Sequence, residues 1–277
     1  MFPIKDNLPT DRFPFVTLAL IVASLVVYLL AIRHGGSLIS GPDATVLFKY
    51  GAIPYALRNP GTHCGLAQIP GGAARAVACH AQHAGLRPSG GAIPVWETVF
   101  SAMFVHASIV QIAGNMLFLW IFGNNVEGAM GPLKFIAFYI AGGVAALALE
   151  VLLVPSATAP TVGAAGGIAA VLGGYILLYP RARVLTLVLI PLFSTVIEVP
   201  ALVMLGIWFV MQALFGAAGL TDPIGGGGVV AYFACAGGFA FGLAATWLLA
   251  SRRRQAPPGD LDQRRLNAGF ARPGGRR

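Results

Sequence analysis

Three polar side chains lie in an otherwise uncharged stretch of this 277-residue chain. The segment FVHASIVQIAGNMLFLW contains His106, Gln111 and Asn115. Gln111 and Asn115 are four residues apart, so a helix would place both amides on one face. If the stretch crosses a membrane, such groups face the interior of a helix bundle and often mark a functional site. The alternative is that they only join neighbouring helices by hydrogen bonds.

Small residues recur in two later segments, TVGAAGGIAAVLGGY and ACAGGFAFG. Gly238 and Gly242 form a GxxxG pair in the second segment, and the first is comparably rich in glycine. This spacing lets two helix backbones approach closely. We therefore expect the two helices to touch and to bring Ala165 near Cys235. Ordinary helix packing without a functional role is the alternative.

Cys64 and Cys79 lie in a long segment, residues 33–95, that is rich in glycine, proline and histidine. The histidines close to them are His63, His80 and His83. Cysteines outside the cytoplasm tend to be oxidised, and a disulfide here would close a loop of about 15 residues. We rank a disulfide first, free thiols second and a zinc site third, because the spacing matches no standard zinc signature. No metal or other cofactor is expected.

The composition excludes a soluble globular protein. Hydrophobic residues make up 57% of the chain and charged residues only 10%, whereas soluble domains carry about 25% charged residues. Disorder of the whole chain is excluded too, because it requires low hydrophobicity. The net charge of +8 is concentrated near the ends of apolar runs, where basic residues normally set membrane topology. Nucleic acid is therefore not an expected partner. The excess of Arg over Lys suggests a bacterial source with a GC-rich genome.

Uncharged runs predict an all-α membrane protein, because each is about as long as a helix that crosses a bilayer. The six expected spans are residues 13–32, 98–126, 134–153, 163–179, 200–215 and 229–250. Residues 184–197 are too short for a span and contain a proline. We expect this segment to lie at the membrane interface or in a re-entrant connection.

The distribution of basic residues predicts the orientation. With the N-terminus inside, 13 of the 18 Lys and Arg residues face the cytoplasm and five face outward, as the positive-inside rule requires. Residues 1–12 would then be a cytoplasmic N-terminus, 13–250 the membrane domain, and 33–95 a long extracytoplasmic loop. Residues 251–277 are basic and rich in Pro and Gly, which predicts a disordered cytoplasmic tail. The expected location is the cell membrane.

Four segments together resemble the rhomboid family of intramembrane serine proteases. They are MFVHASIVQIAGNMLFLWIFGNNVEGAMG, TVGAAGGIAAVLGGYILLYPRARVLTLV, VIEVPALVMLGIWFVMQ and ACAGGFAFG. The resemblance covers residues 2–250 and implies a rhomboid-like bundle of six transmembrane helices. In that family, a Ser in Gly-x-Ser-Gly attacks the peptide carbonyl and a His on the sixth helix takes its proton. A His and an Asn on the second helix stabilise the oxyanion.

Most of those positions carry other residues here. The resemblance places Ala165 at the nucleophile position, Cys235 at the position of the base, and Gln111 and Asn115 at the oxyanion positions. His106 matches the family's first His on the second helix. A methyl group cannot attack a carbonyl. Cys235 could replace the nucleophile only with a base nearby, and at its depth the sequence offers only amides.

We therefore expect a pseudoprotease that binds transmembrane segments of client proteins in the former active-site cavity, with the lipid bilayer as its surroundings. The residues expected around this cavity are His106, Gly163, Gly166 and Gly238. The alternative is an active rhomboid intramembrane serine endopeptidase that cleaves membrane-protein substrates. The sequence does not identify the client or the oligomeric state.

Overall fold

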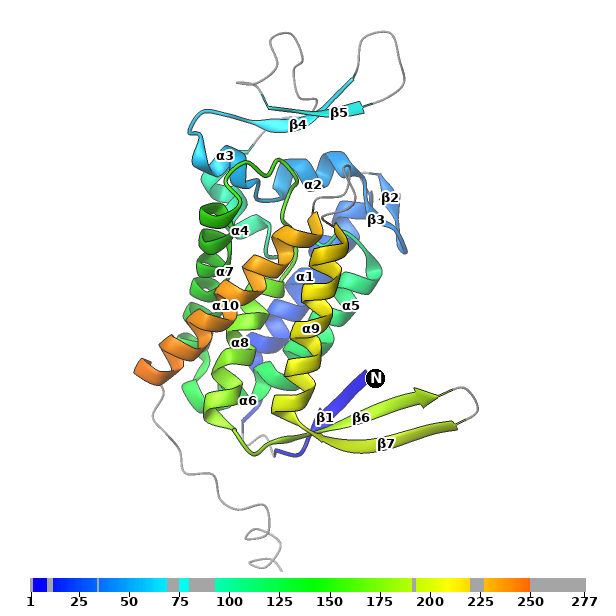
Figure 1. Cartoon of the computed structure of the whole chain (residues 1–277), viewed down its shortest axis with the longest axis vertical. Helices are drawn as coiled ribbons and strands as arrows, with labels where there is room; N and C mark the ends of the chain where they lie inside the picture. Colours follow the sequence, from blue (N-terminus) through cyan, green and yellow to red (C-terminus); the bar gives the residue numbers. More distant parts are fainter. Residues whose placement is uncertain are drawn as a thin grey trace, which may run out of the picture.

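The computed structural model describes residues 2–8, 12–33, 35–68, 75–79, 93–190, 193–219 and 227–249. Most of the described chain is helical, with small sheets at the two ends of a helix bundle (Figure 1). The longer helices are α1 (Phe15–Arg33), α5 (Ile109–Phe118), α7 (Pro132–Leu153), α8 (Ala165–Leu178), α9 (Ala201–Gly219) and α10 (Gly227–Leu249). The short ones are α2 (Ala44–Tyr50), α3 (Pro54–Arg58), η1 (Val95–Glu97), α4 (Thr98–Ser101), η2 (Leu119–Gly123) and α6 (Asn124–Met130). The strands are β1 (Phe2–Asp6), β2 (Gly36–Ser37), β3 (Gly41–Pro42), β4 (Cys64–Gln68), β5 (Arg75–Cys79), β6 (Arg183–Ile190) and β7 (Phe193–Pro200).

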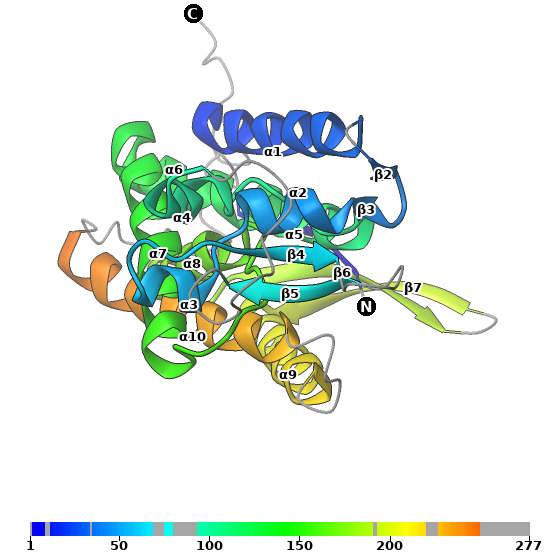
Figure 2. The same ribbon diagram turned by 90° about the horizontal axis from the view of Figure 1, so that it is seen from above.

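Helix α8 forms the centre of the bundle. Every residue from Gly167 to Tyr175 is buried, and α7 and α10 pack against it. Seen from above, α1 and α9 lie on opposite sides of this central group (Figure 2). At 1.5 Å per residue, the 14 residues of α8 span only about 21 Å. The helix that positions the site is therefore shorter than a typical 30 Å hydrocarbon core.

Helices α8 and α10 are in direct backbone contact. A Cβ atom on Gly238 would collide with the carbonyl oxygen of Gly166, and one on Gly242 would collide with that of Ala170. Only glycine allows the backbones to approach this closely. The expectation that the two glycine-rich segments touch is confirmed.

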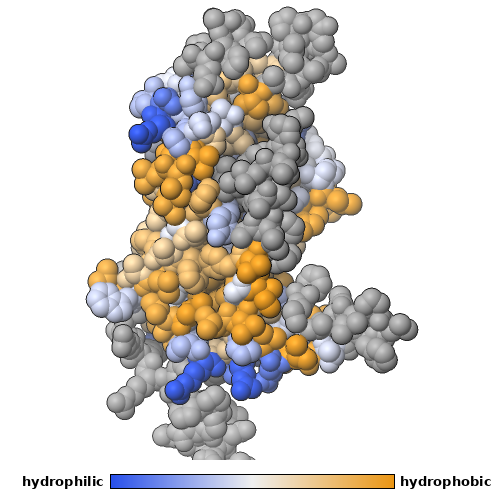
Figure 3. Space-filling view, viewed as in Figure 1, coloured by the Kyte–Doolittle hydropathy of each residue, from blue (hydrophilic) through white to orange (hydrophobic). Residues whose placement is uncertain are grey.

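Three helical segments of the described chain are long and apolar enough to cross a membrane. They are Phe15–Arg33, Ile109–Met130 and Pro132–Leu153. Shorter apolar helices occupy Ala165–Leu178, Ala201–Val210 and Tyr232–Leu248. Apolar side chains cover the middle of the molecular face in Figure 3, and hydrophilic ones gather toward its ends. This distribution is typical of a protein surrounded by lipid.

The expected second span, residues 98–126, is wrong at its start. Helix α4 ends at Ser101, and the continuous helical segment begins only at Ile109. Ser108 caps that helix by accepting a hydrogen bond from the backbone N–H of Gln111 at 3.2 Å, a typical role of an N-cap serine. As a correction, His106 therefore lies in the irregular segment before the helix rather than on it.

The all-α expectation is also too narrow, because β1, β6 and β7 form a three-stranded antiparallel sheet. Its hairpin pairs Arg183 with Pro200 and Ile190 with Phe193, and it projects sideways from the bundle (Figure 1). Of residues 184–197, expected as an interfacial or re-entrant connection, 184–190 belong to β6 and 193–197 to β7. Val, Ile and Thr are frequent in them, and such β-branched residues favour strands.

Strand β1 attaches the N-terminal segment to the bundle through the buried side chain of Asp6. Asp6 accepts hydrogen bonds from the Nδ2 of Asn125 and from the hydroxyl of Tyr175, the latter at 2.8 Å. Burial raises the pKa of the Asp6 carboxyl from 3.8 to about 6, although the hydrogen bond from Tyr175 opposes the shift. The folded protein therefore binds this proton more tightly than the unfolded chain does.

As a consequence, the free energy of unfolding falls as the pH rises from the ordinary pKa of Asp6, 3.8, through its pKa in the folded protein, about 6. From about pH 4 to above pH 6, the free energy of unfolding should decrease by about 3 kcal/mol through this group. Asp6→Asn keeps the acceptor oxygen and should abolish this part of the pH dependence. Thermal unfolding at pH 4.5 and pH 7.5 measures it for both proteins. Equal slopes in both would mean that Asp6 does not contribute.

Candidate functional site

A cavity of about 220 Å³ lies at the N-terminal end of α8. Helix α5 contributes Gln111 and Asn115, α8 contributes Ala165 and Gly166, and α9 contributes Trp208. The other lining residues are Val110, Gly114, Phe118, Thr161, Val162, Gly163, Ile168 and Ala234. Four helices and the connection before α8 thus bring Gln111, Asn115 and Ala165, which the sequence singled out, to one partly open cavity.

The amide of Gln111 is engaged by the backbone on both sides. Its Oε1 accepts a hydrogen bond from the N–H of Ala107 at 2.7 Å, and its Nε2 donates to the carbonyl of Val162 at 2.9 Å. Gln111 therefore fastens the start of α5 to the segment that leads into α8. Of the two N–H donors on Nε2, the bond to Val162 uses one, so the side chain keeps one donor at the cavity.

Asn115 also has unused hydrogen-bonding capacity at the cavity. Its Nδ2 is buried and has no hydrogen-bond partner, and it would lie 3.4 Å from a Cβ atom placed on Gly163. The N-terminal end of α8 carries free backbone N–H groups and a partial positive charge. Together these groups form an environment that favours a carbonyl oxygen or another acceptor.

His106 holds the backbone at the entrance to α8. The N–H of Ala164 donates to its Nε2 at 3.4 Å, and its Nδ1 lies 3.0 Å from the carbonyl oxygen of Phe104. Because an amide can only donate and a carbonyl can only accept, this arrangement requires a neutral imidazole with the proton on Nδ1. His106 is fully buried and does not line the cavity, so its role here is to position the chain.

Ala165 and Cys235 differ in their access to the cavity. Ala165, the first residue of α8, lines it. Cys235 is completely buried within α10, and its neighbour Ala234 reaches the cavity in its place. Gly163, which has a φ of +113°, turns the chain into α8, a conformation that other residues adopt only with strain. Gly166 lines the cavity. Gly238, which was expected there, does not line it; it packs against the backbone of Gly166 in the α8–α10 contact.

Thr161 and Glu150 form a pair that the sequence analysis missed. The Thr161 hydroxyl donates to the Oε1 of Glu150, which is fully buried near the end of α7. The other carboxyl oxygen of Glu150 has no hydrogen-bond partner. A glutamate near the end of an apolar span is visible in the sequence, but its threonine partner on another segment is not. Thr161 carries the one hydroxyl among the residues that line the cavity.

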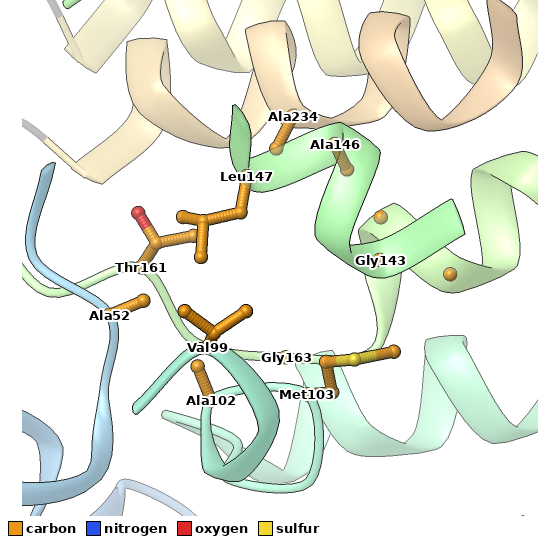
Figure 4. A pocket seen from close by; sticks show the side chains of 12 residues that line it. Ala52, Val99, Ala102, Met103, Gly143, Ala146, Leu147, Thr161, Gly163 and Ala234 are labelled. Carbon is orange, nitrogen blue, oxygen red and sulfur yellow. The ribbon is translucent and has the colours of Figure 1, made fainter. Parts of the chain in front are cut away.

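A second, smaller cavity of about 30 Å³ adjoins the first and shares Thr161 with it. Figure 4 shows the smaller cavity between Val99 and Ala102 on one side and Ala146 and Leu147 of α7 on the other. Its volume is enough for a water molecule, but its walls are largely apolar. The arrangement thus provides a mostly apolar, partly open space beside the start of α8.

A disulfide joins Cys64 and Cys79 across the hairpin of β4 and β5. This hairpin lies at the end of the bundle from which α8 begins (Figure 1). His63 precedes β4, whereas His80 and His83 lie outside the described residues. Since both thiols are consumed by the disulfide, they cannot serve as zinc ligands in this form.

The family comparison agrees with this geometry. The family model of the rhomboid domain matches residues 94–252, more than half of the chain. The chain belongs to the rhomboid family. The matched region contains the cavity, α8 and the contact of α8 with α10, so the positions described above occupy a rhomboid domain.

Several rhomboid relatives are similar over part of this rhomboid chain. Rhomboid-like protein 11, chloroplastic, from Arabidopsis thaliana is 31% identical over 61% of this chain and 57% of its own length. Rhomboid protein 1, mitochondrial, from Saccharomyces cerevisiae is 30% identical over 33% of this chain and 28% of its own. Presenilin-associated rhomboid-like protein A, mitochondrial, from Danio rerio is 33% identical over 33% of this chain and 24% of its own length. The matched part of this chain thus covers between about a quarter and somewhat over half of the length of these relatives.

Proposed function

We propose that this rhomboid-family membrane protein is a pseudoprotease, which binds transmembrane segments of client proteins in its cavity without cleaving them. The observation that carries the proposal is the methyl group of Ala165 at the start of α8, which faces a cavity of about 220 Å³ where the family resemblance places a serine nucleophile. A bound segment would place a backbone carbonyl near Asn115 and the N-terminal end of α8. Hydrolysis would then lack a nucleophile.

The surroundings of Ala165 support this proposal. Both the Oε1 and the Nε2 of Gln111 form hydrogen bonds to the backbone. The buried thiol of Cys235 does not line the cavity. Thr161 donates its hydroxyl proton to Glu150. The described cavity is therefore suited to binding by shape and hydrogen bonds rather than to covalent chemistry.

A lateral route for a client segment lies between α5 and α9. The rings of Phe118 and Trp208 are in contact there, with centroids 5.8 Å apart. Val110, which lines the cavity, is 78% exposed on the outside of α5. Helix α9 packs mainly against α10, so displacement of one aromatic contact would open the cavity toward lipid. A client helix could then unwind locally and present its backbone to Asn115.

The proposed topology is a bundle of six membrane-spanning helices in the cell membrane, with both termini in the cytoplasm. The three long apolar segments and the three shorter apolar helices support that number. The excess of basic residues at the N-terminal side and in residues 251–277 supports the orientation. The tail itself lies outside the described residues.

Site-specific photocrosslinking tests client binding. A photoreactive benzoylphenylalanine at Trp208 should crosslink to proteins with transmembrane segments in cells, because the side chain lines the cavity beside the lateral route. The same probe at Ala113, which is exposed on α5 away from the cavity, should yield no more than background lipid and protein adducts. Equal adducts from both positions would contradict binding in the cavity.

One observation favours the alternative, an active endopeptidase. The Thr161 hydroxyl borders the cavity and is hydrogen-bonded to a carboxyl group, and a carboxylate can act as a general base toward a hydroxyl. If that pair were active, the protein would form a covalent adduct with a hydroxyl-directed inhibitor. Thr161→Val would then remove the adduct while leaving client binding in place.

A further inference from the structure

A third cavity, of about 630 Å³, opens between α1 and α2, away from the cavity at α8. Val27, Leu30 and Ala31 of α1 form one wall, and Thr45, Val46, Lys49 and Tyr50 of α2 form the other. Ser101, Phe104 and Val105 close the groove at its base. Figure 2 shows α2 lying beside α1 when the molecule is seen from above. The volume is in the range of sites for small organic ligands.

The polar groups of this α1–α2 groove leave one cation available. The Ser101 hydroxyl donates to the carbonyl of Tyr50, and the Thr45 hydroxyl donates to Asp43 at the start of α2. Lys49 lies over the ring of Tyr50, with its Nζ 5.3 Å from the ring centroid. Within the described residues, its ammonium group has no carboxylate partner. The groove therefore combines largely apolar walls with an ammonium group that forms no salt bridge within the described residues.

The groove also opens onto a surface that faces lipid. On the same helix, Val26, Leu29 and Leu30 are each close to half exposed, and α1 is one of the three segments long and apolar enough to cross a membrane. Lys49 lines the groove together with Val27, Leu30 and Ala31, which belong to the C-terminal part of α1, and the end of a span meets the headgroup layer. An ammonium group at this depth can form a charge-assisted hydrogen bond to the phosphate of a lipid headgroup.

We propose that this groove binds an anionic glycerophospholipid. Its phosphate would pair with Lys49, and its acyl chains would run along Val27 and Leu30 toward the middle of α1. The groove would hold the headgroup and the upper part of the chains, while the remainder lies on the exposed apolar face of α1. A bound lipid would thereby connect α1 to the segment that carries α2.

Native mass spectrometry of the full chain in detergent tests this site with dioleoylphosphatidylglycerol as the probe. The wild type should retain one molecule of this lipid in preference to dioleoylphosphatidylcholine. Lys49→Gln should weaken retention about fivefold, as expected for one basic group near an anionic headgroup. Val46→Trp, which fills the groove, should reduce retention of the lipid further. Lys49→Gln removes the charge without adding volume to the groove, so its result decides the test even if Val46→Trp does not fold.

Arg58→Gln is the matched control, since Arg58 is an exposed cation near α2 that does not line the groove. It should leave lipid retention unchanged. An equal loss in both variants would overturn the proposal, because attraction to net charge alone would explain it. Displacement of the lipid by an equal concentration of inorganic phosphate would overturn it too, because the acyl chains would then contribute nothing.

Discussion

Replacing Ala165 by Phe is expected to abolish the capture of client transmembrane segments while the helix bundle stays folded. The added benzyl group would extend from the first residue of α8 into the cavity of about 220 Å³ and occupy the space proposed for the client backbone. Crosslinking from position 208 should fall at least about tenfold, which corresponds to about 1.4 kcal/mol of binding free energy. Ala165 is only partly buried, so the larger side chain has room without displacing a packed neighbour.

Ala113→Phe provides the control for that prediction. Ala113 is on the same helix as Gln111 and Asn115 but is exposed on the outer surface of α5. The same increase in size there should leave crosslinking from position 208 at the wild-type level. If Ala165→Phe is folded, with a wild-type thermal midpoint, and still captures clients, the binding site is not this cavity.

Glu127→Ala is expected to cause the largest loss of stability. The buried carboxylate of Glu127 accepts hydrogen bonds from the N–H groups of Val16 and Thr17, at 2.9 and 2.8 Å, and from the Thr17 hydroxyl at 2.8 Å. These contacts cap the first turn of α1 from α6, where a negative charge also complements the positive end of the helix. Removing the carboxylate leaves three donors without a partner, at a cost of roughly 3–5 kcal/mol.

Denaturation of the purified protein by sodium dodecyl sulfate, monitored by the protection of α1 from proteolysis, measures this effect. Glu127→Gln keeps one acceptor oxygen and should lose about half as much. Glu198→Ala is the matched carboxylate control, because Glu198 is exposed and its one salt bridge within the described residues is to exposed Arg183, a contact worth about 0–1 kcal/mol. A loss at Glu127 no greater than at Glu198 would contradict the capping role.

Much of the membrane domain follows from patterns in the sequence. Uncharged runs identify α1, α7 and the later helices, since length and apolarity together determine what can cross a bilayer. The GxxxG pair indicates the close contact of α10 with α8, because glycine spacing acts through backbone geometry alone. The resemblance also leads to Gln111, Asn115 and Ala165, which the structure places around one cavity.

Other features depend on contacts that no local pattern reveals. The break between α4 and α5 interrupts an uncharged run, so hydropathy does not detect it, whereas the capping residue Ser108 marks it in the structure. The β6–β7 hairpin gains a third strand from β1, far away in the sequence. Glu127 and Glu150 each find a partner on another segment. Such pairings become visible only when the chain is folded.

Gln111 illustrates how one substitution changes the role of a position. The family pattern calls for an imidazole that contributes to the oxyanion site, but the amide here bridges Ala107 and Val162. This bridge stabilises the connection before α8, which contains Gly163 with its positive φ. The position therefore supports the shape of the cavity, and Asn115 contributes a donor directed at a bound carbonyl.

Intact-mass analysis after incubation with a fluorophosphonate tests the central claim most directly. The purified wild-type chain, treated in detergent beside an active rhomboid protease as the positive control, should show no added mass because position 165 offers only a methyl group. A stoichiometric adduct on the folded chain would contradict a pseudoprotease. Loss of such an adduct in Thr161→Val would then assign the nucleophile to the Thr161–Glu150 pair.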